Sequence, residues 1–147
     1  MPWSELPHRG TLYMQVAFDS ARRLARFRRS DRALTAGSAD GILAQFTEDL
    51  DRVLPKSERA KLRLLADTRE APRAADPELE GKLLTIMTPI MTSFDCVAVL
   101  LRTPIGLLQM RRLMRTWPIR GEVFEDESEA ILWLLRQDAS TPRSGRD

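Results

Sequence analysis

Cysteine and histidine are almost absent from this 147-residue sequence. Cys96 is the only cysteine, so no disulfide can form within the chain, and a reducing cytoplasm is the expected setting. His8 is the only histidine and lies in an N-terminal segment that we expect to be loose. A histidine-based triad or a histidine-rich metal site would have to recruit that segment. We therefore expect no catalytic residues, no metal and no cofactor.

Long apolar runs and phosphate-binding glycine loops are missing as well. No segment approaches the roughly 18 apolar residues of a membrane span. Residues 1–7 lack the basic stretch and apolar block that are typical of a secretion signal. Residues 35–41 include two glycines, Gly37 and Gly41, but not the spacing of a phosphate-binding loop. We expect neither secretion, membrane insertion nor a nucleotide cradle.

One segment that is present fixes the fold class. From Cys96 to Leu101 every residue is apolar, and the run stops at Arg102, Thr103 and Pro104. A strand is apolar at every position only when both of its faces are covered, so the segment predicts an α/β fold with helices packed on a sheet. Within such a strand, the Cys96 side chain is expected to be buried and unreactive, and burial is expected to raise the pKa of its thiol.

The N-terminal third predicts a hairpin. Apolar residues alternate with others from Leu12 to Phe18, Asp19 and Ser20 supply a turn, and a second strand covers residues 24–29. The short connection makes this pair antiparallel. We expect residues 1–10 to be a loose leader, residues 11–137 to form one domain, and the polar residues 138–147 to be a disordered tail.

Helices and strands then alternate. Helix starts are predicted at Ser38 or Asp40, at Asp76 with Pro77, at Thr103 with Pro104, and at Asp126 with Glu129. Further strands are predicted near residues 62–67, at 96–101 and at 123–124. The stripes expected to face the core are Ile42, Leu43, Phe46, Leu50 and Val53; Leu79, Leu83, Ile86, Met87, Ile90 and Phe94; Leu107, Leu108, Leu113, Met114 and Trp117; and Ile131, Leu132, Trp133 and Leu135. The order predicts a mixed sheet of about five strands, a hairpin followed by parallel strands, with about four helices.

In this element order, and in the segments at residues 63–67 and 97–104, the sequence resembles the STAS domains (sulfate transporter and anti-sigma factor antagonist) over about residues 11–136. It is most similar to the small bacterial STAS-like proteins. The resemblance implies a non-enzymatic regulatory or scaffolding module that binds protein. Antagonists of this family carry a phosphorylatable serine at the start of the helix that follows the third strand. Residues 73–78 have no hydroxyl there, and Asp76 is interpreted as a helix cap rather than a phosphate mimic, so the serine switch is not implied.

The carboxyl ends of the parallel strands are where an open sheet binds ligands. Five residues there form a candidate anion site, in which two arginines, a threonine hydroxyl and the N–H groups of the helix that starts at Thr103 would hold a phosphate or carboxylate: Asp67, Thr68, Arg69, Arg102 and Thr103. The competing interpretation is structural: Thr103 caps its helix and Asp67 pairs with an arginine. A small-molecule or anion-binding domain is therefore the alternative function.

Charge is unevenly distributed along the chain. Six arginines fall between residues 22 and 32, and an acidic cluster covers residues 122–129. Only Phe27 lies among the arginines to stack on bases, so we interpret them as a solvated edge strand rather than as a nucleic-acid site. A protein partner, with a homodimer as one arrangement, would use the hairpin edge or the helix after Thr103. The candidate contact residues are Arg26, Arg28, Met110, Arg111 and Arg115.

Overall fold

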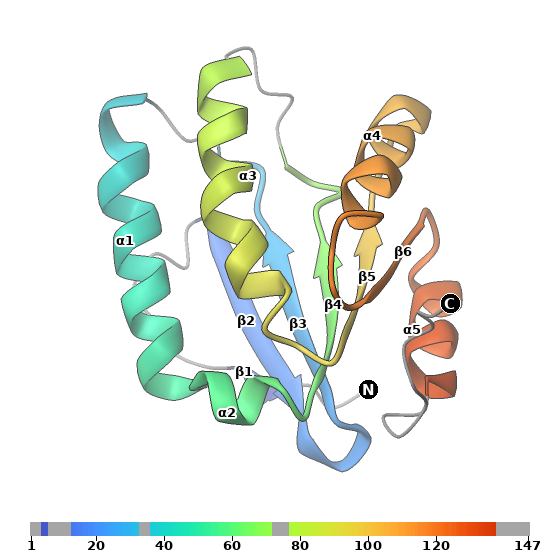
Figure 1. Ribbon diagram of the computed structural model, residues 1–147. Helices are drawn as coiled ribbons and strands as arrows, with labels where there is room; N and C mark the ends of the chain where they lie inside the picture. Colours follow the sequence, from blue (N-terminus) through green and yellow to red (C-terminus); the bar gives the residue numbers. More distant parts are fainter. Residues whose placement is uncertain (1–3, 6–12, 33–35, 72–76, 138–147) are drawn as a thin grey trace.

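The computed structural model describes residues 4–5, 13–32, 36–71 and 77–137, and within them one sheet of six strands in chain order (Figure 1). β1–β2 and β2–β3 are antiparallel, and β3 to β6 are parallel. The strands are β1 (Ser4–Glu5), β2 (Met14–Asp19), β3 (Leu24–Arg29), β4 (Arg63–Asp67), β5 (Cys96–Leu100) and β6 (Arg120–Phe124). The predicted α/β class, with a hairpin followed by parallel strands, is confirmed.

Helical segments connect the successive strands from β2 onward, and a last helix follows β6. They are η1 (Ser20–Arg22, a 3₁₀ turn), α1 (Ala36–Val53), α2 (Lys56–Arg59), α3 (Pro77–Met91), α4 (Pro104–Met114) and α5 (Glu127–Arg136). The sequence did not predict β1, η1 or the four-residue α2. β1 pairs with Phe18 and Ala17 of β2, so the segment interpreted as a loose leader contains two paired residues. The tail at 138–147 lies outside the described residues.

Helices cover both faces of the sheet, and their distribution follows from the strand order. Right-handed crossovers between strands that are consecutive in the sheet place the connecting helices on one face. Accordingly Phe46 of α1, Met87 of α3 and Met114 of α4 belong to one buried cluster. Ala130 and Leu134 of α5, which follows the last strand, belong to a second cluster on the opposite face. Figure 1 shows this arrangement, with α4 and α5 near the β6 edge.

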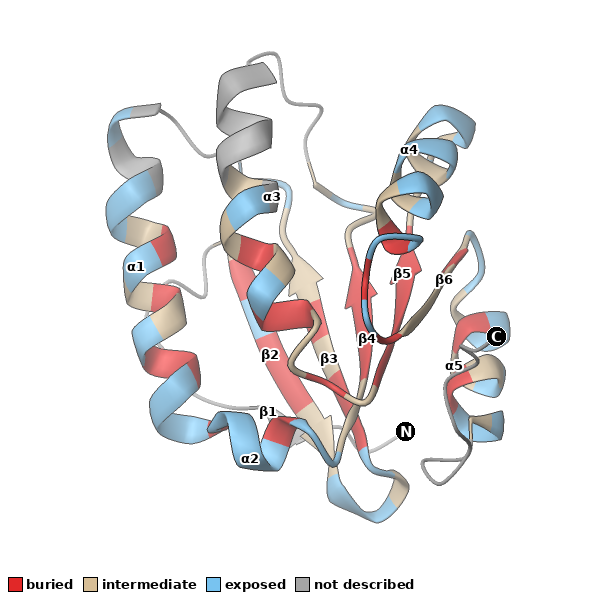
Figure 2. Cartoon of the chain, viewed as in Figure 1, coloured by how far each residue is buried: buried red, intermediate tan, exposed pale blue. Residues whose placement is uncertain are grey.

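β5 is the inner strand that the apolar run predicted. It lies between β4 and β6, and each of its five residues is at most 1% exposed (Figure 2). Val97 and Val99 face the three-helix cluster, whereas Cys96, Ala98 and Leu100 face α5. Because both faces are covered, alternation of polar and apolar residues is absent, as in parallel sheets generally.

Two of the predicted helix caps are confirmed. Thr103 Oγ1 accepts a hydrogen bond from the Gly106 N–H at 3.1 Å, with Pro104 at the first helical position. Asp126 Oδ2 accepts from the Glu129 N–H at 3.0 Å. The cap predicted at Ser38 or Asp40 is wrong, because α1 already begins at Ala36. Asp76 lies outside the described residues, although α3 does begin at Pro77.

Some residues predicted to face the core are exposed instead. Leu108 is 49% exposed and Val53 is 40% exposed. On α4 the inward residue of the adjacent pair is Leu107, which packs against the core, and Leu108 lies about 100° away from it around the helix, toward the solvent. On α5 the exposed fractions are 51% for Leu132 and 41% for Leu135. The fully buried residues of α5 are Ala130 and Leu134, one turn apart.

Candidate functional site

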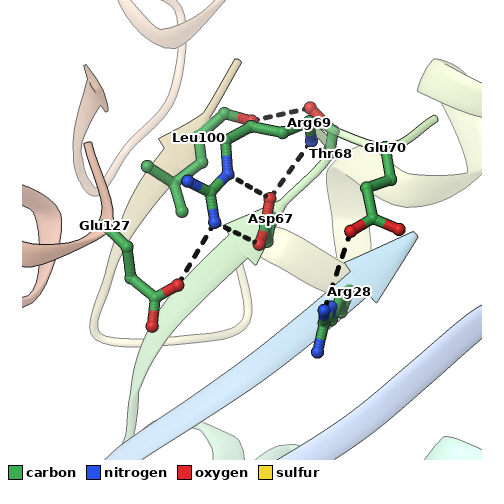
Figure 3. A network of polar contacts seen from close by, with 7 residues as sticks. All are labelled: Arg28, Asp67, Thr68, Arg69, Glu70, Leu100 and Glu127. Carbon is green, nitrogen blue, oxygen red and sulfur yellow. Dashed lines mark hydrogen bonds and ion pairs between the residues drawn. The ribbon is translucent and has the colours of Figure 1, made fainter. Parts of the chain in front are cut away.

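The carboxyl ends of β4 and β5 lie side by side, as the sequence predicted. Asp67 and Leu100, the last residues of the two strands, are register partners. Thr68 continues the pairing, because its N–H and its hydroxyl both donate to the Leu100 carbonyl, at 3.1 Å and 2.8 Å. Figure 3 shows Asp67, Thr68 and Arg69 together at this edge of the sheet.

Arg69 holds Asp67 through three hydrogen bonds. Its Nε donates to Asp67 Oδ1 at 3.0 Å, its Nη2 donates to Oδ2 at 2.9 Å, and its backbone N–H donates to Oδ1 at 3.1 Å. Nη2 also donates to Glu127 Oε1 at 3.2 Å (Figure 3). Glu127 lies in the first turn of α5, so Arg69 joins the end of β4 to the start of that helix.

Electrostatics at this pair favour the ionised forms. Burial alone would raise the pKa of Asp67, but the hydrogen bonds from Arg69 and the charges of Arg69 and Arg28 outweigh it and lower that pKa. The pKa of Arg69 is raised, chiefly by its hydrogen bond to Asp67. The Asp67 side chain is 9% exposed, so its charge depends on Arg69 rather than on water.

Arg102 and Thr103 stand apart from that pair. Thr103 uses its hydroxyl to cap α4, and exposed Arg102 donates from Nη2 to the Ala71 carbonyl at 3.4 Å. Within the described residues, Asp67 is paired with Arg69 and Thr103 caps its helix, as in the structural interpretation of the sequence. An anion site at this edge therefore stays a prediction, for which Arg102 is the exposed cation.

Glu127 is the member of this network that the sequence analysis missed. It belongs to the acidic cluster at residues 122–129, but 58 positions separate it from Arg69. The one available signal was its place in the first turn after the Asp126 cap, where acidic residues are common. Such a signal predicts a helix start and not a partner on a distant strand.

Arg26 and Arg28 lie on an inner strand, so their interpretation as part of an exposed edge is wrong. β3 pairs with β2 on one side and with β4 on the other, and the outer side of β2 pairs with β1. Both arginines are half-buried, and Arg28 forms an ion pair with Glu70 at 3.7 Å (Figure 3). The parallel pairing of β3 with β4 was the contact that the local pattern did not specify.

Met110 packs on the core side of α4, and the outward face of the helix carries the other two predicted contact residues, Arg111 and Arg115. Met110 is half-buried, Arg111 and Arg115 are exposed, and Arg111 Nε lies 3.5 Å from Glu122 Oε1. The same face also exposes residues spaced three, four and three positions apart, which places them in one stripe. We call this stripe the α4 surface: Ile105, Leu108, Arg112 and Arg115.

Two kinds of feature are absent from the described residues. Across the described ranges, no three histidine, cysteine or acidic side chains are grouped so that they could bind a metal ion. In the same part of the chain, none of the helices has the length and apolarity that crossing a bilayer requires.

Cys96 is expected to be chemically inert in the folded protein. Its side chain is fully buried, and burial with the nearby Asp95 charge raises its pKa to about 12. Since the thiolate is the reactive form, a thiol reagent at pH 8 should label native protein far more slowly than urea-unfolded protein. Equal labelling rates in the two states would contradict the buried placement of β5.

One solved structure relates this fold to a known one. An uncharacterised protein of the DUF3478 family from Shewanella loihica PV-4, with a SpoIIAA-like fold, matches with a TM-score of 0.58 and 14% sequence identity. The match covers 91% of this chain and 96% of that chain. Neither a family model nor a curated protein matches the sequence. The similarity confirms the STAS-like α/β fold. At 14% sequence identity it shows nothing beyond the fold.

Proposed function

We propose that this chain is a non-enzymatic regulatory or scaffolding module that binds a protein partner through the α4 surface, in the reducing cytoplasm that its single cysteine suggests. The observation that carries the proposal is the composition of that stripe. Ile105 is 67% exposed and Leu108 is 49% exposed, and both precede two exposed arginines on the same face.

Arg112 and Arg115 differ from the arginines that are already paired with carboxylates, among which is Arg111. Arg22, Arg52, Arg63 and Arg69 each pair with a carboxylate. Within the described residues, Arg112 and Arg115 make no ion pair, and α4 itself contains no acidic residue. A basic helix face without its own counter-charges favours an acidic partner.

Apolar side chains beside these arginines would supply the binding energy. Isolated exposed leucines are common on proteins, but here two large apolar residues lie one turn apart. Interface centres combine apolar anchors with arginine, and this stripe carries both, whereas Met110 packs against the core. The arrangement matches the recognition of an amphipathic helix through anchors at helical spacing.

Affinity capture tests the proposal. Tagged wild-type protein should recover a partner from lysate of the native host, and Ile105→Ser with Leu108→Ser should reduce the recovery at least tenfold. Val53→Ser is the matched control, because it removes an exposed apolar residue from α1 instead. Equal recovery by all three proteins, or recovery of nothing by wild type, would refute the proposal.

A further inference from the structure

The apolar and basic residues of the α4 surface occupy different ends of the helix. Along the helix its apolar residues, Ile105 and Leu108, come first, and Arg112 and Arg115 follow. A partner helix that satisfies both halves needs carboxylates beside the C-terminal half of α4 and apolar side chains beside the N-terminal half.

The outward face of α5 has the complementary order. Exposed Glu129 lies in the first turn and exposed Glu125 just before the Asp126 cap, and Leu132 and Leu135, 51% and 41% exposed, follow toward the C-terminal end. Neighbouring acids are already engaged, since Asp126 caps the helix and Glu127 binds Arg69. Within the described residues, Glu125 and Glu129 make no ion pair.

We propose that the α4 surface of one copy packs antiparallel on the outward face of α5 of a second copy. In that orientation Ile105 and Leu108 lie against Leu132 and Leu135, and Arg112 and Arg115 face Glu129 and Glu125. The contact cannot form within one molecule, because α4 and α5 cover opposite faces of the sheet (Figure 1). The inference rests on the proposed function in using the same α4 surface.

The geometry makes the assembly head-to-tail. Each copy offers two different surfaces, so binding leaves one of each available and further copies can add, as a ring or an open chain. A single pair of surface helices falls among transient interfaces, under about 1,200 Å². Assembly should therefore grow with protein concentration and weaken as salt screens the charged half.

Two complementary variants test this mode in sedimentation velocity experiments. Arg112→Glu with Arg115→Glu reverses the charge of the α4 surface and should abolish its binding. Leu132→Glu with Leu135→Glu places charges on the apolar part of the α5 face and should abolish binding there. Wild type should form species that grow with concentration, and each variant alone should stay monomeric. A mixture of the two should stop at a 1:1 dimer, because only one intact α4 surface and one intact α5 face remain per pair.

Controls separate this inference from the proposed function. If circular dichroism shows that the α5 variant is unfolded, Glu125→Gln with Glu129→Gln takes its place. A wild-type protein that is monomeric at every concentration, or a mixture that stays monomeric, would overturn the head-to-tail contact. If such a monomer still captures another protein through Ile105 and Leu108, the proposed function stands and the head-to-tail contact falls. If the protein self-assembles but captures no other protein, the head-to-tail contact stands and binding of another protein falls.

Discussion

Replacement of Arg69 by methionine is expected to lower the free energy of unfolding at pH 7 by about 3 kcal/mol, the lower end for breaking a buried pair. Methionine retains much of the apolar stem but leaves the Asp67 carboxylate, 9% exposed, without the side chain that neutralises it. The link from β4 to Glu127 of α5 is lost as well. Urea unfolding at pH 7 measures the difference.

The pH dependence of that loss identifies its cause. In the wild type the pKa of Asp67 is lowered, so the pair stabilises the fold above the ordinary aspartate pKa of about 4, and this contribution disappears as pH falls through the lowered value. Without the Arg69 side chain, burial, the largest single cause, is opposed only by the backbone N–H of residue 69 and the charge of Arg28, so the pKa of Asp67 is expected to rise. The two proteins should therefore differ most at neutral pH and converge toward pH 3, where Asp67 is protonated in the variant.

Glu127→Gln is the matched control for this network. Glu127 is 38% exposed and contributes one contact to Arg69, so its replacement should cost less than about 1 kcal/mol. A loss as large as that of the Arg69 variant would show that attachment of α5, and not the charge of Asp67, dominates. An Arg69→Met protein as stable as wild type would contradict the pairing itself.

Leu134→Ala is expected to cost about 2–5 kcal/mol, the range for a leucine truncated within a packed core. Leu134 is fully buried between α5 and the sheet, with Leu65, Ala98 and Leu100 in the same cluster. Leu135→Ala, one residue on and 41% exposed, should change stability by less than about 1 kcal/mol. Thermal or urea unfolding of both at low protein concentration checks the prediction, and equal losses would contradict the observed orientation of α5.

Local signals predicted the elements whose causes are local. The apolar run gave β5, since each of its residues needs cover on both faces, and hydroxyl or carboxylate caps gave the starts of α4 and α5. The alternation near Met14 and the turn at Asp19 gave the antiparallel hairpin, although not its register. In each case the physical cause lies within a few residues of the element.

Features that depend on contacts distant in sequence were not predicted. The choice of Leu107 over Leu108 as the inward residue depends on how α4 meets β6, and Ala130 was passed over because a small residue carries little apolar signal. β3 was interpreted as an edge because nothing in its sequence specifies pairing with β4. The Arg69–Glu127 contact likewise exists only after α5 has packed.

The central claim is that the α4 surface is where a partner binds, and crosslinking in the living host tests it most directly. A photoreactive amino acid at Leu108, which is 49% exposed, should yield a covalent adduct on illumination, whereas the same probe at Val53, 40% exposed on α1, should yield none. Adduct formation at Val53 alone, or at neither position, would contradict the claim.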